Sequence, residues 1–124
     1  MELDIGKLTN EGEGLLRDFV QKMGLEGGLI ATAEGLEMAS FFTGNQEVDI
    51  IAADMASLLS STHSVLTDSD KGKLSEMIIT SDQGAVAIKD LGEDVVFGVL
   101  APANYKMGGL VVALKKFVSE LQAL

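Results

Sequence analysis

Residues 48–66 read VDIIAADMASLLSSTHSVL, and this stretch decides the fold that we expect for the chain. Its larger apolar side chains recur at the i, i+3, i+4, i+7 spacing of a helix that lies on a hydrophobic core. The positions on this core face are Val48, Ile51, Ala52, Met55, Leu58, Leu59, Thr62 and Leu66. The opposite face carries mainly small side chains, namely Ala53, Ser57, Ser60 and Ser64, flanked by Ile50, Ala56 and Ser61.

The small-residue face predicts that the helix is buried on two sides. Only Asp49 and Asp54 interrupt it, whereas a face in contact with water normally carries many charges. Small side chains let a second backbone approach closely, and a second copy of the helix is the simplest partner because twofold dimers are the commonest assemblies. Two alternatives stay open. In one, the helix lies inside a single larger core; in the other, this face carries short side chains and is in contact with water.

Composition narrows the classes of partner. The 124 residues favour one domain, 1–124, and an apolar content of 47% argues against disorder. The formal net charge is −10, and Arg17 is the only arginine. A protein without clustered basic residues is expected to bind nucleic acid or an anionic membrane surface poorly.

Several features favour a cytoplasmic location. The sequence has no cysteine, which fits a reducing compartment and excludes a disulfide framework. The first residues are acidic and lack the basic and apolar segments of a signal peptide. No apolar run approaches the roughly 20 residues of a membrane span.

The remaining chain predicts two more helices and five strands. One helix begins near Thr9 or Asn10, and the last covers about 107–121. A hairpin follows the first helix, and a three-stranded meander follows the long helix. The expected strands are 29–32, 36–42, 74–81, 85–90 and 95–101. The order α-β-β-α-β-β-β-α indicates an α+β fold, in which one five-stranded, largely antiparallel sheet has helices on both faces.

No residue pattern predicts catalysis, a cofactor or a metal site. His63 is the only histidine, so we expect no histidine pair for zinc and no serine–histidine relay, and we interpret it as a solvated or interface residue. The segment 68–72 fails the register of a calcium loop, because Ile79 stands where the bidentate glutamate belongs. We interpret Glu76 as a charge that protects a strand edge rather than as a general acid.

The layout resembles the roadblock family, which comprises dynein light chains of roadblock type and bacterial and archaeal relatives that work with Ras-like GTPases. Residues 28–40, GLIATAEGLEMAS, are similar to the first hairpin of the family, with Gly35 in its turn. Residues 52–56, AADMA, resemble the alanine-rich start of its central helix, and 74–102 its strand meander. The resemblance covers about residues 8–121. The polar segment 68–72 departs from the family pattern, as does the lack of an arginine after Leu110.

The resemblance implies a homodimer in which the third strands join edge to edge and the central helices pack side by side. That arrangement implies a ten-stranded sheet and a profilin-like protomer. The implied dimer interface is Ile50, Ala53, Ser57, Ser60, Ser61, Ser64, Ser75, Glu76, Met77, Ile78 and Ile79. The residues that would bind a different partner are not indicated.

The first functional hypothesis, implied by the resemblance, is a non-enzymatic homodimeric scaffold that binds a small Ras-like GTPase and modulates its nucleotide cycle. A second is an adaptor subunit of a motor or membrane-tethered complex without GTPase contact. A third is a ligand-binding sensory module, although the sequence shows no convergent polar cluster for a pocket.

Overall fold

The computed structural model describes residues 2–124 and contains one five-stranded antiparallel sheet with three helices. The elements follow the expected order, so the fold class is confirmed. They are α1 (Ile5–Met23), β1 (Gly27–Thr32), β2 (Glu37–Phe42), α2 (Val48–Asp68), β3 (Met77–Ser81), β4 (Gly84–Gly92), β5 (Val95–Pro102) and α3 (Met107–Gln122).

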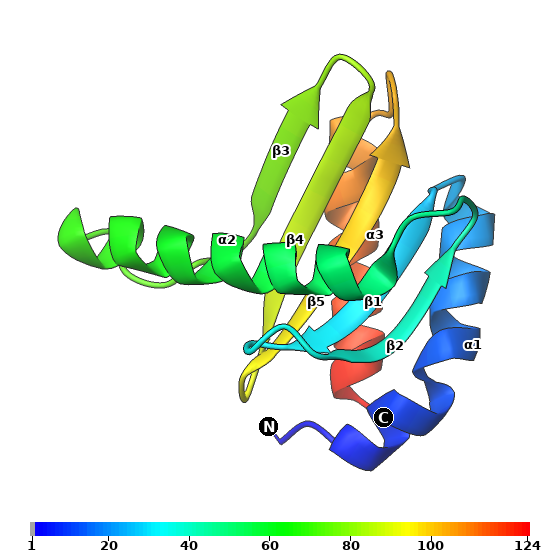
Figure 1. Cartoon of the computed structure of the whole chain (residues 1–124), viewed down its shortest axis with the longest axis horizontal. Coiled ribbons are helices and arrows are strands. Elements are labelled where there is room, and N and C mark those ends of the chain that lie inside the picture. Colours follow the sequence, from blue (N-terminus) through cyan, green and yellow to red (C-terminus); the bar gives the residue numbers. More distant parts are fainter. Residues whose placement is uncertain (1) are drawn as a thin grey trace.

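The sheet is covered by α2 on one face and by α1 and α3 on the other (Figure 1). Its strand order is β2-β1-β5-β4-β3, so β5 is the central strand and β3 is an edge strand. The near-continuous apolar run of β5 is buried on both faces, because a central strand meets helices on both sides. Phe97 faces the cluster with α1 and α3, and Val96 faces the cluster under α2.

Two glycines let the helices approach the sheet closely. A Cβ atom at Gly98 on β5 would lie 2.4 Å from the Met55 Sδ atom of α2. A Cβ atom at Gly12 on α1 would lie 2.6 Å from the Ala39 Cβ atom of β2. Gly12 therefore lowers the intrinsic helix propensity of α1 but permits its packing on the sheet.

The predicted start of α1 near Thr9 or Asn10 was wrong. The helix begins at Ile5, and the Asp4 carboxylate caps it by accepting a hydrogen bond from the Lys7 backbone N–H at 3.0 Å. A capping side chain in the preceding extended residue satisfies one of the free N–H groups of the first turn. The helix ends at Met23, and Gly24 caps it with the left-handed φ of 67° that glycine adopts readily.

The predicted start of the third strand at residue 74 was also wrong. β3 begins at Met77, where its pairing with Ile88 of β4 starts. Ser75 and Glu76 precede the strand because the chain is still returning from the end of α2, which lies beyond the sheet (Figure 1).

Candidate interaction surface

The outer edge of β3 is open. Among residues 2–124, only β4 pairs with β3, over the register Met77↔Ile88 to Ser81↔Gly84. Met77 packs with the cluster under α2, and Ile78 packs with the cluster on the opposite face. Ile79 is exposed, at 39%. An unpaired strand edge with an apolar neighbour offers backbone N–H and C=O groups to another strand.

Helix α2 lies on the sheet only along its first half. Ala52, Met55, Ala56 and Leu59 are buried, and no residue of the helix after Leu59 is buried. The last nine residues, 60–68, form a projecting arm that is about 14 Å long at the helical rise per residue. Figure 1 shows this arm extending past β3, away from the rest of the sheet.

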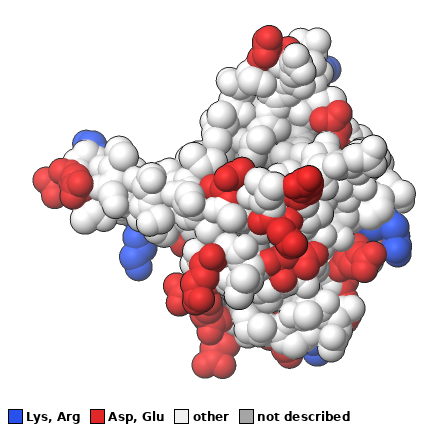
Figure 2. Space-filling model, viewed as in Figure 1, with Lys and Arg blue, Asp and Glu red and all other residues white. Residues whose placement is uncertain are grey.

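The outward face of α2 has the composition expected from the sequence. All six predicted interface residues of this helix are exposed: Ile50, Ala53, Ser57, Ser60, Ser61 and Ser64. Ile50 is 55% exposed although it is a large apolar residue. In the space-filling view, the arm is largely uncharged along its length and carries charges near its far end (Figure 2). A weakly charged face of this kind is suited to contact with protein rather than water.

The assignment of α2 residues to faces was wrong at two positions. Ala56 is buried, because it lies one helical turn from Ala52 on the face toward the sheet. Leu58 was expected on the core face but is 39% exposed. Leu58 and Val65 continue the flank of Ile51 at seven-residue intervals, and Val65 is 66% exposed because the sheet ends before the helix does.

Leu58 and Val65 therefore belong to the exposed apolar surface, and neither was among the predicted interface residues. The signal that could have identified them is the width of the apolar arc, which exceeds what one sheet face covers. Ser75 and Glu76, which were predicted as interface residues, lie next to the open edge but outside β3.

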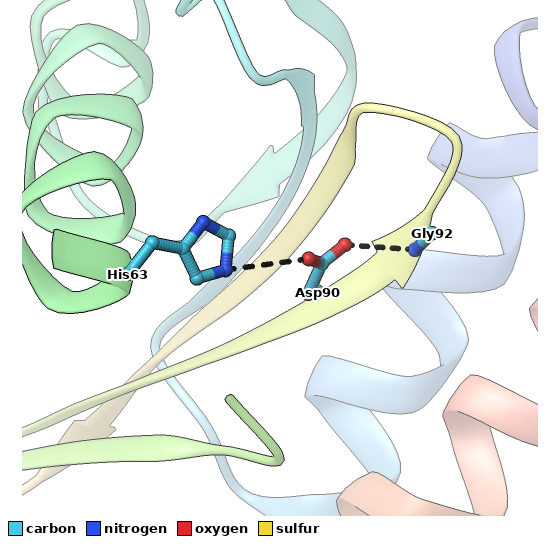
Figure 3. A network of polar contacts seen from close by, with 3 residues as sticks. All are labelled: His63, Asp90 and Gly92. Carbon is cyan, nitrogen blue, oxygen red and sulfur yellow. Dashed lines mark hydrogen bonds and ion pairs between the residues drawn. The ribbon is translucent and has the colours of Figure 1, made fainter. Parts of the chain in front are cut away.

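His63 connects the arm of α2 to the end of β4 (Figure 3). Its Nε2 atom lies 3.6 Å from the Asp90 Oδ2 atom, and the other Asp90 oxygen accepts a hydrogen bond from the Gly92 backbone N–H at 2.8 Å. The His63 side chain is 45% exposed. Two hollows of about 220 and 670 Å³ adjoin this pair. The contact is a surface ion pair when the histidine is protonated, and an exposed pair of this kind contributes little to stability.

The described residues contain neither a cluster of metal-ligating side chains nor a membrane-spanning helix. Among residues 2–124, no group of three or more histidine, cysteine, aspartate or glutamate side chains could hold a metal ion. No helix in the described part of the chain is long and apolar enough to cross a membrane. The features that the structure shows at this surface are the open edge of β3 and the exposed apolar residues beside it.

Comparison with known proteins places the chain in a family. The model of the Roadblock/LC7 domain matches residues 11–101, and the chain belongs to this family. Two uncharacterized proteins of Methanocaldococcus jannaschii, MJ0310 and MJ1340, are each 21% identical over 101 residues, which cover 82% of this chain and 88% of the relative.

Solved structures share the fold at low sequence identity. MglB of Myxococcus xanthus has a TM-score of 0.84 at 14% identity, with 99% of this chain and 90% of that chain covered. The Roadblock/LC7 domain from Streptomyces avermitilis has a TM-score of 0.81 at 18% identity, with 90% and 94% covered. The gliding protein MglB from Thermus thermophilus has a TM-score of 0.81 at 12% identity, with 99% and 92% covered. The predicted family is confirmed.

Proposed function

We propose that the protein is a non-enzymatic homodimeric scaffold that binds a small Ras-like GTPase and modulates its nucleotide cycle. The observation that carries the proposal is the open edge of β3 beside the projecting, weakly charged arm of α2. Neither feature is completed by any other part of residues 2–124. A second copy of the chain supplies a matching strand edge and a matching helix face.

Twofold pairing of two β3 strands accounts for both features. The sheet would continue from one protomer into the next as ten strands. An arm of about 14 Å spans roughly three strand spacings of about 4.8 Å, so it would lie over the first strands of the second sheet. That arrangement would remove Leu58, Val65 and Ile79 from water. The burial of each side chain would stabilise the dimer in proportion to the apolar area buried.

The GTPase is the partner implied by the roadblock resemblance. Family membership and the net charge of −10 are consistent with a protein surface that binds a basic region of a partner. Such a scaffold would alter nucleotide turnover by holding the switch loops of the GTPase in one conformation. Arg17 is a poor candidate for an arginine finger because it lies on α1, on the opposite sheet face from α2.

The first test is the solution mass by light scattering after size exclusion. We expect about twice the chain mass of 13.1 kDa for the wild type and a mass near one chain for Ser57→Arg. The matched control is Ser119→Arg, which places the same side chain on an exposed position of α3 and should remain dimeric. A monomeric wild type, or equal dissociation of both variants, would contradict the proposed interface.

The second test measures nucleotide hydrolysis and exchange by a purified Ras-like GTPase from the same organism. We expect saturable binding that depends on whether GTP or GDP is bound, and unchanged stimulation by Arg17→Ala. Loss of stimulated hydrolysis in Arg17→Ala with binding retained would contradict the mechanism. Stable assembly with a protein that is not a GTPase, and no GTPase binding, would select the adaptor function instead.

A further inference from the structure

A groove runs between α1 and α3 on the sheet face opposite α2. It has a volume of about 430 Å³, and its apolar lining consists of Leu15, Phe19 and Met23 from α1 and Ala113 and Phe117 from α3. Four charged residues complete the lining, namely Asp18 and Lys22 on α1 and Lys116 and Glu120 on α3. This groove is separate from the edge of β3 and from α2, so dimerisation there would leave it open.

The floor of the groove is an aromatic pair. The rings of Phe19 and Phe117 are stacked, with centroids 4.1 Å apart and an interplanar angle of 12°. Phe117 is buried, but Phe19 is only half-buried, as are Leu15 and Met23. Ala113, which has a small side chain, also lines the groove. Apolar surface therefore remains in contact with water inside a concave site, which is the usual setting for an inserted apolar side chain.

The charges of the groove are arranged by sign along its length. Helices α1 and α3 run in opposite directions, since α1 rises in Figure 1 from its first residues while α3 descends. Because Phe19 stacks on Phe117, these two residues define the same height along the two helix axes. At the helical rise, Asp18 and Glu120 fall within about 3 Å of each other along the axis, and so do Lys22 and Lys116.

The groove thus has an acidic end and a basic end, which are about 6 Å or one helical turn apart. One internal ion pair touches these residues: the Arg17 Nε atom lies 3.7 Å from the Asp18 Oδ1 atom. Both partners of that pair are exposed, so it offsets the carboxylate charge only weakly. Within residues 2–124, no ion pair joins Lys22, Lys116 or Glu120 to an opposite charge.

We propose that this groove is a docking site for an amphipathic helix of a partner protein. The helix would insert apolar side chains at i, i+3, i+4 and i+7 beside Phe19 and Phe117, as in other helix-in-groove complexes. A basic residue of the partner would lie over Asp18 and Glu120, and an acidic residue four positions away would lie over Lys22 and Lys116. The i, i+4 spacing matches the separation of the two charged ends of the groove.

The test uses three synthetic helical peptides that share one leucine stripe and differ in the charges that flank it. One carries lysine and glutamate four residues apart, one carries only lysine, and one carries only glutamate. Binding to the full chain is measured by fluorescence anisotropy. We expect the mixed peptide to bind most tightly, because each uniform peptide meets one end of the groove with like charge.

Two protein variants distinguish docking in the groove from non-specific binding of the peptide. Ala113→Trp fills the groove and should lower the affinity for the mixed peptide by about tenfold or more. Val112→Trp is the matched control, because Val112 is the adjacent residue on α3 but is 69% exposed and outside the groove lining. It should bind like the wild type.

A charge variant tests the specificity. Lys22→Glu combined with Lys116→Glu makes both ends acidic, so the all-lysine peptide should become the tightest ligand by about five- to tenfold. A change in folding alone would not reverse a preference among peptides. The dimer mass should stay unchanged in these variants, which keeps this test independent of the proposed β3 and α2 interface.

Several results would overturn the proposal. One is the absence of saturable binding of the mixed peptide below about 1 mM. Another is an equal loss of affinity for that peptide in Ala113→Trp and Val112→Trp. A third is an unchanged preference among the three peptides in the charge variant. A species of four chains that Ala113→Trp abolishes would show that a second copy, rather than a partner helix, occupies the groove.

Discussion

Two glycines of α1, Gly12 and Gly14, lie two residues apart and should respond to alanine with opposite changes in stability. Alanine favours a helix over glycine by about 1 kcal/mol at an interior position. At Gly14 the added Cβ atom meets only the end of the Arg17 side chain, at 3.7 Å. We therefore expect Gly14→Ala to raise the free energy of unfolding by about 0.5–1 kcal/mol.

Gly12→Ala meets a different environment. Its added Cβ atom would lie 2.6 Å from the Ala39 Cβ atom, which has no rotatable bond to move aside. An ordinary van der Waals separation requires α1 to move away from β2 by about 0.8 Å or more. Overpacking of this kind costs about 1–3 kcal/mol, which exceeds the gain in helix propensity, so we expect a net loss of about 1 kcal/mol.

Urea unfolding followed by circular dichroism, at one fixed protein concentration, measures both variants. The fixed concentration matters because subunit association would add to the measured stability. We expect the two free energies of unfolding to differ by about 2 kcal/mol, with the wild type between them. Equal stabilisation by Gly12→Ala and Gly14→Ala would refute the close-packing argument for α1.

Four further substitutions test individual contacts by the same unfolding assay. Tyr105→Phe removes the hydrogen bond that the hydroxyl donates to the Met23 carbonyl at 2.6 Å, and should lower stability by about 1 kcal/mol; no change would exclude this link between α1 and the loop before α3. Asp4→Ala removes the N-cap of α1 and should cost about 1 kcal/mol, whereas an unchanged value would place the stable helix start later. His63→Ala should cost less than about 0.5 kcal/mol, since the ion pair is exposed, while Asp90→Ala should cost about 1 kcal/mol because it also loses its backbone hydrogen bond. The reverse order would show that the histidine holds the arm of α2 in place.

Local patterns were sufficient for the element order and the fold class. Helical and strand periodicity identified all eight elements, because both are properties of neighbouring residues. The boundaries were less accurate where distant contacts decide them. The start of α1 depends on the Asp4 cap and on Leu3, whose backbone N–H donates to the Glu93 carboxylate from the β4–β5 turn.

The candidate interaction surface was predicted in part. The small outward face of α2 could be read from one helix, and its exposure in the structure agrees with that reading. The width of the apolar arc indicates more apolar surface than one sheet face covers, but it does not show how far the sheet extends beneath the helix, so it could not show which residues, Leu58 and Val65 among them, remain exposed. The same limit applies to Gly12, whose role depends on Ala39 in another element.

The sequence by itself determined the order of helices and strands, the family resemblance, the acidic charge and the small face of the central helix. Only the tertiary structure decided that α2 extends beyond the sheet, that β3 has an open edge and that α1 and α3 enclose a groove with separated charges. The physical reason is that periodicity records which side of an element is apolar. Packing between residues far apart in the chain decides which of those apolar sides remain uncovered.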